Sequence, residues 1–434
     1  MKPGVGEFRS RQQPITHIAP TRPGMSWLAW LFLMVLRRIS KLKMARGLEF
    51  IHFAQWQRVR TKKLPRLSPD QPAENFSHDF FMFTTNYNGD WDQYIDTFAR
   101  VAHIRRGMWW LWRFSQGFPG PIPLRNFKQF IHYQTYSEAL YYSAYPAATV
   151  RNIAAALEVK RELEAFSAVR PGEETPAAFK KRYLGMVTAI APNLGSAPGP
   201  APYVIATSQP GGLPAMVTYT RNGKRKRKLA LGPLLGRLAT GGGGEQTLIA
   251  AMSPIEVKPA HAVTKEIASR IAAVNASTSP SPFAMCPMLH MARLLIIDDL
   301  RPKLGSRPSA SLRTNYLLFV AAIDGRLEDF LDCLYTADPD FAQGVWGRCL
   351  GYPEGRDGPV YLRRYIARSL LPVQLPFVGF PGHSALDIRR ALRVHSNMLD
   401  WMGDVHRTDM SDAELMAAWQ GQLAVLLAGD EATR

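Results

Sequence analysis

The feature that most constrains the fold of this 434-residue chain is a sequence pattern that occurs twice. The segment "FMFTTNYNGDWDQYIDTF" begins at Phe81, and the similar segment "LLFVAAIDGRLEDFLDCL" begins at Leu317. Asn88 in the first segment corresponds to Asp324 in the second, an offset of 236 residues, and a glycine follows each of them. A pattern that returns in the same register indicates an internal repeat.

Four further blocks match in the same order along the chain, with offsets between 234 and 238 residues. The matching pairs are "FIHFA" and "MLHMA", "WRFSQGFP" and "WGRCLGYP", "FKQFI" and "LRRYI", and "AYPAATVRNIAAAL" and "GFPGHSALDIRRAL". Five blocks in one order, with so little drift, are hard to produce by chance. The sequence therefore predicts a duplication, with one repeat at residues 47–167 and the other at residues 286–401.

Each block of the repeat has a readable local form. The segments "FIHFAQWQRV" and "FFMFTTNY" are rich in aromatic and β-branched residues and are predicted as strands. The segment "DWDQYIDTFARV" carries apolar residues at helical spacing and is predicted as a helix. We predict "MWWLWRF" and "FKQFIHY" as two more strands. The last helix has Thr149 or Ser384 as its N-cap, with Asn152 or Asp387 three residues later.

The predicted order is therefore ββαββα in each repeat, a circular permutation of the ferredoxin-like βαββαβ layout. Such a unit has a four-stranded antiparallel sheet with both helices on one face, so its other face needs cover. Two units in one chain can cover each other, sheet against sheet. The expected fold class is α+β, a tandem duplication of a permuted ferredoxin-like unit that forms an intramolecular dimeric α+β barrel.

The rest of the chain divides around the two repeats. Residues 1–24 are polar and basic and are predicted as a flexible tail. Residues 168–285 are predicted as a connecting segment with a basic hairpin, "MVTYTRNGKRKRKLAL". Residues 402–434 are predicted as a C-terminal helix.

An apolar segment near the amino terminus predicts contact with a membrane surface. The run "WLAWLFLMVL" begins at residue 27 and is followed by "RRISKLK". Ten residues of helix span about 15 Å, half of the hydrocarbon core of a bilayer. Residues 25–46 are therefore predicted as an interfacial amphipathic helix, and the alternative is a helix that packs on the protein's own core. The residues predicted to bind the membrane are Trp27, Trp30, Arg37, Arg38, Lys41 and Lys43.

The charge balance points to an anionic partner. The formal net charge is +18, although coding bias toward arginine is an alternative explanation. Few aromatic residues flank the basic run "RNGKRKRK" at residues 221–228, so we favour acidic phospholipid over nucleic acid. Three scattered cysteines do not make a disulfide framework. The expected location is cytoplasmic, peripheral to the inner face of the cell membrane.

Three histidines are candidates for chemistry. His52 and His290 occupy the same position in the two repeats, so a pseudo-twofold axis would bring them to one cavity. There they could bind haem or a metal, or act as acid and base, and the alternative is one local hydrogen bond each. His383 precedes the N-cap Ser384, whereas the equivalent residue of the other repeat is Ala148. One site in a duplicated fold would show such an asymmetry, and a solvated histidine is the alternative.

The pattern "IHFAQW … FMFTTNYNGDW … YID" resembles an uncharacterised bacterial family with an "HFARW"-like strand and an "SNFDG"-like turn. That family is similar in fold to the dimeric α+β-barrel superfamily, which includes dye-decolourising peroxidases, chlorite dismutases and haem-degrading monooxygenases. The peroxidases carry a G-x-x-D-G motif, and the nearest stretch here is "AAIDG", with Ala321 in place of the first glycine. The resemblance implies haem as a candidate cofactor and Asp324 as a catalytic candidate beside His383.

The first expectation for function is a membrane-surface-associated protein of unassigned activity. The second is a haem-dependent peroxidase or monooxygenase acting on a small molecule, with cofactor contacts from His52, His290 or His383. A nucleic-acid-binding protein is the third, and it depends on the net charge alone. No spacing in the chain resembles a zinc motif, a P-loop or a dinucleotide fingerprint.

Overall fold

A computed structural model describes residues 12–39, 50–100, 109–168, 174–195, 246–277, 279–300, 311–405 and 408–427. Contacts within the chain divide it into two compact units. The first contains the chain up to Pro146 and from Tyr203 to Gly382, and the second contains Ala147–Pro202 and His383–Arg434.

The first unit holds two antiparallel sheets. The first sheet has the strand order β4-β1-β3-β2-β9, and the second has the order β5-β7-β8-β6. The strands of the first sheet are β1 (Gln12–Pro20), β2 (Ile51–Val59), β3 (Phe80–Asn88), β4 (Thr135–Tyr136) and β9 (Leu375–Val378). Those of the second are β5 (Leu140–Ser143), β6 (Gln246–Val257), β7 (Leu289–Ile297) and β8 (Thr314–Asp324).

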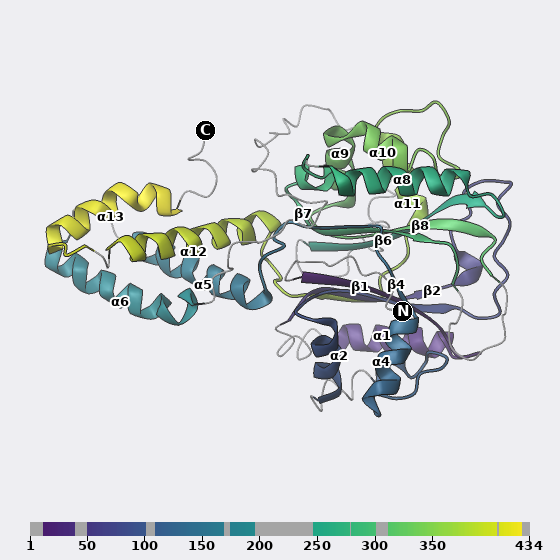
Figure 1. The fold of residues 1–434 in the computed structure, drawn as a ribbon, viewed down its shortest axis with the longest axis horizontal. Coiled ribbons are helices and arrows are strands. Elements are labelled where there is room, and N and C mark those ends of the chain that lie inside the picture. The colour runs from purple at the N-terminus through teal and green to yellow at the C-terminus, as the bar shows by residue number, and fades with distance from the viewer. Residues whose placement is uncertain are drawn as a thin grey trace. The chain divides into compact units, whose positions relative to one another are not determined.

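Helices cover one face of each sheet, and the other faces pack against each other (Figure 1). Below the first sheet in the figure lie α1 (Ser26–Ile39), α2 (Trp91–Arg100) and α4 (Leu124–Tyr133). Above the second lie α8 (Ala262–Ala276), α9 (Leu327–Ala337), α10 (Pro339–Val345) and α11 (Pro359–Ser369). Two short 3₁₀ helices, η1 (Thr61–Lys63) and η2 (Pro282–Met285), precede β3 and β7.

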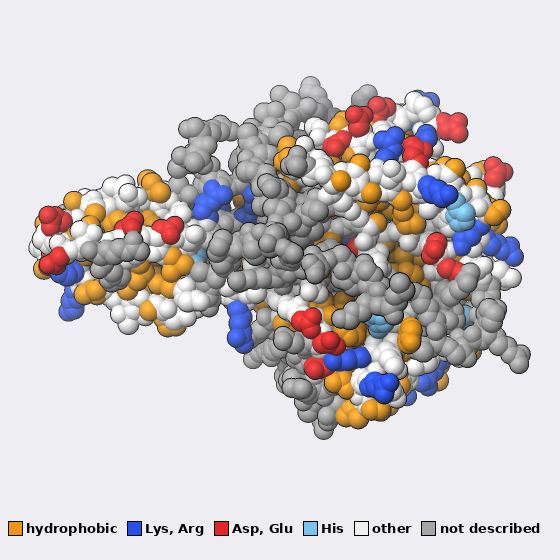
Figure 2. All heavy atoms as spheres, viewed as in Figure 1, with side chains coloured by type: hydrophobic (Ala, Val, Ile, Leu, Met, Phe, Trp, Pro, Cys, Tyr) orange, Lys and Arg blue, Asp and Glu red, His pale blue; other side chains and the backbone are white. Residues whose placement is uncertain are grey.

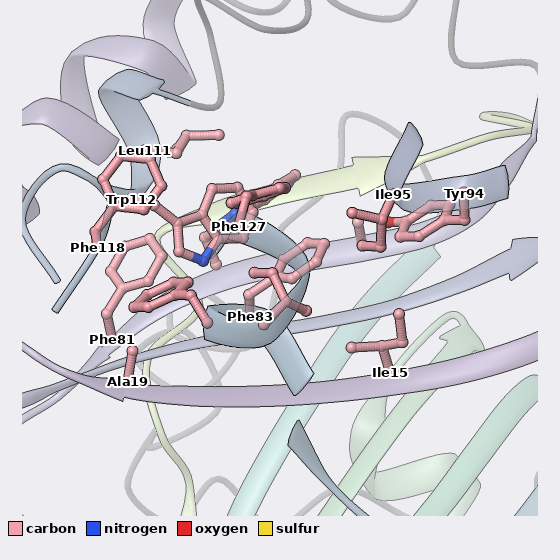
Figure 3. Close-up of a cluster of buried hydrophobic side chains, with 14 of the residues drawn as sticks. Ile15, Ala19, Phe81, Phe83, Tyr94, Ile95, Leu111, Trp112, Phe118 and Phe127 are labelled. Carbon is pink, nitrogen blue, oxygen red and sulfur yellow. The ribbon is translucent and has the colours of Figure 1, made fainter. Parts of the chain in front are cut away.

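The alternation of β3 shows why the layers form. Phe81 and Phe83 point into the core between the first sheet and its helices, with Trp112 and Phe127 (Figure 3). Phe80 and Met82 belong instead to the core between the two sheets. Successive side chains of a strand point to opposite faces, so a strand that is apolar on both faces must be covered on both.

The second unit consists of helices. They are α5 (Val150–Ser167), α6 (Pro176–Leu194), α12 (Ala385–Val405) and α13 (Asp412–Leu427), packed around one apolar core. The predicted N-caps are present. The Asn152 N–H donates to Thr149 Oγ1 at 3.1 Å, and the Asp387 N–H donates to Ser384 Oγ at 3.0 Å.

The mixed α+β class is as predicted, but the barrel and two of the strands are not. The described residues form two separate antiparallel sheets and no closed barrel. The segment "FKQFIHY" lies in α4, and residues 109–112 of "MWWLWRF" are also helical. Within α4, Phe127, Phe130 and Ile131 are buried at helical spacing, and this spacing outweighs the β propensity of their aromatic rings.

Two strands lie outside the predicted repeats. Residues 12–20, predicted as part of the flexible tail, form β1, which lies between β4 and β3. Residues 246–276, predicted as part of the connection, contain β6 and α8 of the first unit. The predicted basic hairpin, including residues 221–228, lies outside the described residues.

Candidate functional site

His52 and His290 lie at matching irregularities of the two sheets. The pairing of β2 with β3 shifts register between Ile51 and Phe53, and that of β7 with β8 shifts between Leu289 and Met291. Each histidine is thus the extra residue of a β-bulge, a feature that redirects a side chain. Both histidines are completely buried.

The two histidines contact the same tyrosine, and His52, His290 and Tyr145 are here named the histidine centre. The ring of Tyr145, two residues after β5, lies 6.0 Å from the His52 ring and 6.0 Å from the His290 ring, centroid to centroid. Phe53 of the first sheet also packs on His290, with ring centroids 5.1 Å apart. The two histidines, which the sequence analysis expected to face one cavity, thus pack on the same tyrosine ring.

His290 links a hydroxyl to a carboxylate. Its Nδ1 lies 2.9 Å from the Tyr145 hydroxyl, and its Nε2 lies 2.8 Å from Asp324 Oδ1. The Gln246 side-chain nitrogen also lies 3.2 Å from Nε2, and the tautomer of the ring decides which of these contacts His290 donates. Burial, and then the Asp324 carboxylate, raises the pKa of Tyr145 well above its usual value. Tyr145 is therefore a hydrogen-bond donor and not a phenolate.

His52 has a different partner. Its Nε2 lies 2.9 Å from Asn88 Nδ2, whereas its Nδ1 has no hydrogen-bond partner among the described residues. Burial lowers the pKa of His52 to about 3, the Asn88 contact opposes this shift, and the nearby His290 adds to it. His52 is therefore neutral near pH 7. Position 88 holds an amide, whereas position 324, which matches it in the sequence blocks, holds a carboxylate.

Little empty space adjoins this centre. A cavity lined by Phe53, Asn86, Met291 and Arg293, among others, has a volume of about 10 Å³, room for one water molecule at most. Pockets for ligands of haem size measure on the order of 300–1,000 Å³. This cavity therefore has no room for haem, and the described residues contain no cluster of three metal-ligating side chains.

Arg293 is one of the residues that line this cavity, and the sequence-based predictions did not include it. It is 2% exposed and reaches from β7 across to the first sheet. Its Nη1 donates to Ile15 O at 2.9 Å, and its Nη2 donates to Thr85 O at 2.9 Å and to Asn86 Oδ1 at 2.6 Å. The sequence did indicate a buried charge here, because an arginine interrupts the apolar run "MARLLII".

Arg293 also has a buried acidic partner. Its Nη1 lies 3.5 Å from Glu138 Oε1. Burial lowers the pKa of Arg293 and raises that of Glu138, and the attraction between the two charges opposes both shifts. The pair joins the two sheets and carries no exposed group that could reach a ligand.

His383 is found in the other unit of the chain. It belongs to the second unit, where it is exposed and precedes the N-cap Ser384. Burial opposes ionisation of Asp387, but hydrogen bonds from Ser384 lower the pKa of that carboxyl. The neighbouring Lys160 and His383 lower it further. Asp324, the other catalytic candidate, is in the first unit as the partner of His290.

Helix α1 places apolar side chains in solvent. Ala29 and Leu33 of this helix are buried inside the first unit. Trp27 is 57% exposed and Val35 is 46% exposed. The exposed residues on α1 and the adjoining helical turn at 109–112 are here named the tryptophan surface: Trp27, Trp30, Leu31, Val35, Trp109 and Trp110.

Helix α1 and the helical turn at 109–112, which carry this surface, are in contact. Phe32 of α1 stacks on Trp110, with ring centroids 5.9 Å apart. The Arg113 guanidinium lies 4.7 Å from the Trp109 ring centroid and 4.6 Å from that of Trp110, which brings positive charge to the surface. Figure 2 shows hydrophobic side chains beside Lys and Arg side chains over the helices that cover the first sheet.

The structure describes four of the six residues that are predicted to bind a membrane. Trp27 and Trp30 are exposed, and Arg37 and Arg38 stand in the last turn of α1. Lys41 and Lys43 lie outside the described residues. None of the helices in the described ranges combines the length and the apolar character needed to cross a bilayer.

Comparison of this chain with family models, with curated proteins and with solved structures gave no match.

Proposed function

We propose that this protein associates reversibly with acidic membrane surfaces through the tryptophan surface. The observation that carries the proposal is the solvent exposure of six large apolar side chains on α1 and the adjoining turn. Scattered apolar residues are normal on a protein surface, but a contiguous group is typical of an interaction site. Tryptophan favours the depth of lipid headgroups, because one part of its ring system is apolar and its N–H is polar.

The charge of the chain favours lipid as the partner. The formal net charge is +18, and Arg37, Arg38 and Arg113 lie close to the exposed tryptophans in sequence or in space. Each basic residue near an acidic leaflet contributes about 1 kcal/mol, and a half-exposed large apolar side chain contributes on the order of 1 kcal/mol when it inserts. Together these terms are sufficient for weak, reversible binding without a spanning helix.

Vesicle sedimentation tests the proposal. We expect the protein to sediment with phosphatidylcholine vesicles that contain phosphatidylserine, and to do so less at high salt or with phosphatidylcholine alone. The variant Trp27→Ser/Trp30→Ser/Val35→Ser should lower the partition coefficient at least tenfold, since it removes on the order of 3 kcal/mol. Point substitutions are needed because a deletion of the amino-terminal segment would also remove β1.

The matched control is Leu184→Ser/Val425→Ser in the second unit, where both residues are similarly exposed, at 49% and 50%. This control should bind vesicles as the unchanged protein does. Equal binding by the tryptophan variant and the unchanged protein would refute the proposal. Since the three cysteines are free thiols, as in a reducing compartment, we place the association at the cytoplasmic face.

We also propose that the first unit arose by duplication, with each repeat beginning one strand and one helix before the first matching sequence block. What supports this is a set of equivalent contacts. The Gln55 side chain donates to Ile249 O across the sheets at 3.2 Å, as Arg293 does to Ile15 O at 2.9 Å. These pairs are related by the offsets 238 and 234, within the range found for the sequence blocks.

The ends of the repeats give a second set of equivalent contacts. The Ala144 N–H donates to His290 O at 2.8 Å, and the Gly379 N–H donates to His52 O at 2.7 Å. Strand β5 of one repeat thus pairs with the sheet of the other, and β9 does the reverse. An experimental structure tests the idea. Residues 12–143 and 246–378 should superpose strand by strand, and different strand orders would refute the duplication.

The other two expectations receive less support. The small cavity between the sheets has no room for haem. Nucleic-acid binding depends on the net charge and on residues 221–228, which the structure does not describe.

A further inference from the structure

We propose that Cys286 and Cys333 form a redox-active dithiol, which closes to an intramolecular disulfide when a hydroperoxide oxidises it. Cys286 follows η2 directly, and Cys333 lies in α9. The site lies outside the tryptophan surface, so the inference does not depend on membrane binding.

Aromatic packing holds η2 beside α9. Phe283 of η2 and Phe330 of α9 both stack on Phe319 of β8, at centroid distances of 6.2 Å in each case and with interplanar angles of 10° and 8°. Cys333 lies one helical turn after Phe330, on the side of α9 that meets η2. All three rings are fully buried, so neither element can move away without opening the core.

The two thiols are within reach of each other. Cys333 Sγ lies 3.7 Å from Met285 O, the carbonyl that precedes Cys286. Each of the two thiols also shifts the pKa of the other, as expected for close neighbours. The Cys286 backbone is fixed on both sides, because its N–H donates to Phe283 O at 3.2 Å and its carbonyl accepts from the Leu289 N–H at 3.0 Å.

The environments of the two thiols differ in a way that assigns their roles. Cys286 is 1% exposed, whereas Cys333 is partly open to solvent. The hydrogen bond from Cys286 lowers the pKa of Cys333, and the same bond, together with burial, raises the pKa of Cys286. Cys333 is therefore the thiol that reacts with the oxidant, and Cys286 is the resolving thiol.

The chemistry balances in two steps. The Cys333 thiolate attacks the hydroperoxide, an S–O bond forms as the O–O bond breaks, and an alcohol or water leaves with the proton. Cys286 then attacks the resulting sulfenic acid, an S–S bond forms as the S–O bond breaks, and water leaves. The hydroperoxide is reduced by two electrons and the two thiols are oxidised by two.

The disulfide would fix the start of β7. Cys286 precedes β7 by three residues, and the second residue of that strand is His290. Oxidation would thus link the chain just before β7, the strand that carries His290, covalently to α9.

Thiol counting and peptide mapping test the proposal on the full-length protein. After reduction and desalting, exposure to dilute hydrogen peroxide should lower the number of free thiols from three to one. Mass mapping under non-reducing conditions should find one cross-linked peptide pair, containing Cys286 and Cys333 and two mass units lighter than its reduced parts. Dithiothreitol should restore three thiols.

Two variants complete the test. Cys349 is fully buried and burial raises its pKa to about 12, so Cys349→Ser should leave the cross-link unchanged. Cys286→Ser should remove it and leave a Cys333 sulfenic acid that dimedone traps. An unchanged count of three thiols, a cross-link that contains Cys349 or joins two chains, or dimedone labelling equal in Cys286→Ser and unchanged protein would each overturn the proposal.

Discussion

His17 gives the sharpest energetic prediction. This residue of β1 faces the helices, with ring centroids 5.4 Å from Phe130 and 6.2 Å from Trp112. It is completely buried, and neither ring nitrogen makes a hydrogen bond of good geometry to the described residues. Burial lowers its pKa from 6.5 to about 3, and the Ile131 backbone offsets only part of this shift.

The sign and size of the effect follow from linkage. The pKa of His17 is lower in the folded state than in the unfolded chain, so its contribution to stability is complete above pH 6.5 and is lost as the pH falls toward 3. Between pH 7.5 and 5.5 the unfolded ring takes up a proton and the folded ring does not. One pKa unit corresponds to about 1.4 kcal/mol, so this interval lowers the free energy of unfolding by about 1.4 kcal/mol.

Urea unfolding of the unchanged protein and of His17→Leu, at pH 7.5 and pH 5.5, measures this term. The free energy of unfolding should fall by about 1.4 kcal/mol less in the variant than in the unchanged protein. At pH 7.5 the variant should be at least as stable, because leucine is of similar size and leaves no polar atom buried. An equal loss of stability in both proteins would show that His17 is protonated or hydrated in the folded state, and the reasoning would be wrong.

Two further predictions concern the buried polar groups. Tyr145→Phe removes the donor to His290 Nδ1 and should cost about 1–3 kcal/mol in urea unfolding, and an unchanged midpoint would mean that this bond contributes nothing. Arg293→Met leaves Glu138 buried without its partner and should cost about 3–5 kcal/mol, whereas the double variant Arg293→Met/Glu138→Gln should recover part of that loss. A double variant less stable than Arg293→Met would argue against the charge explanation.

Local sequence pattern determined many of the elements. The aromatic and β-branched residues of "FFMFTTNY" and "IHFAQW" predict β3 and β2, and the helical spacing in "DWDQYIDTF" predicts α2. The turns that follow β3 and β8 were also readable, since Gly89 and Gly325 adopt φ angles of 91° and 73°. Conformations of this kind depend on a few neighbouring residues, so the chain specifies them before it folds.

Local pattern was misleading where two preferences compete. Prolines at positions 14 and 20 make β1 a poor strand by propensity, yet the segment pairs with β3 over its whole length. In α4, aromatic residues favour a strand, but their spacing lets Phe127 and Phe130 enter the core together. In both cases burial against other elements decided the conformation, and propensity is the weaker term.

The sequence alone indicated only some of the residues at the histidine centre. The predicted repeat puts His52 and His290 at matching positions, and the bulges that turn them belong to their own strands. Tyr145, which contacts both rings, is brought there by β5, a strand that pairs with β7 about 150 residues further along the chain. Arg293 likewise finds its acceptors in β1 and β3, more than 200 residues away. Contacts at such separation leave no periodic trace in the sequence, because they depend on how the two sheets stack, and only the tertiary structure fixes that.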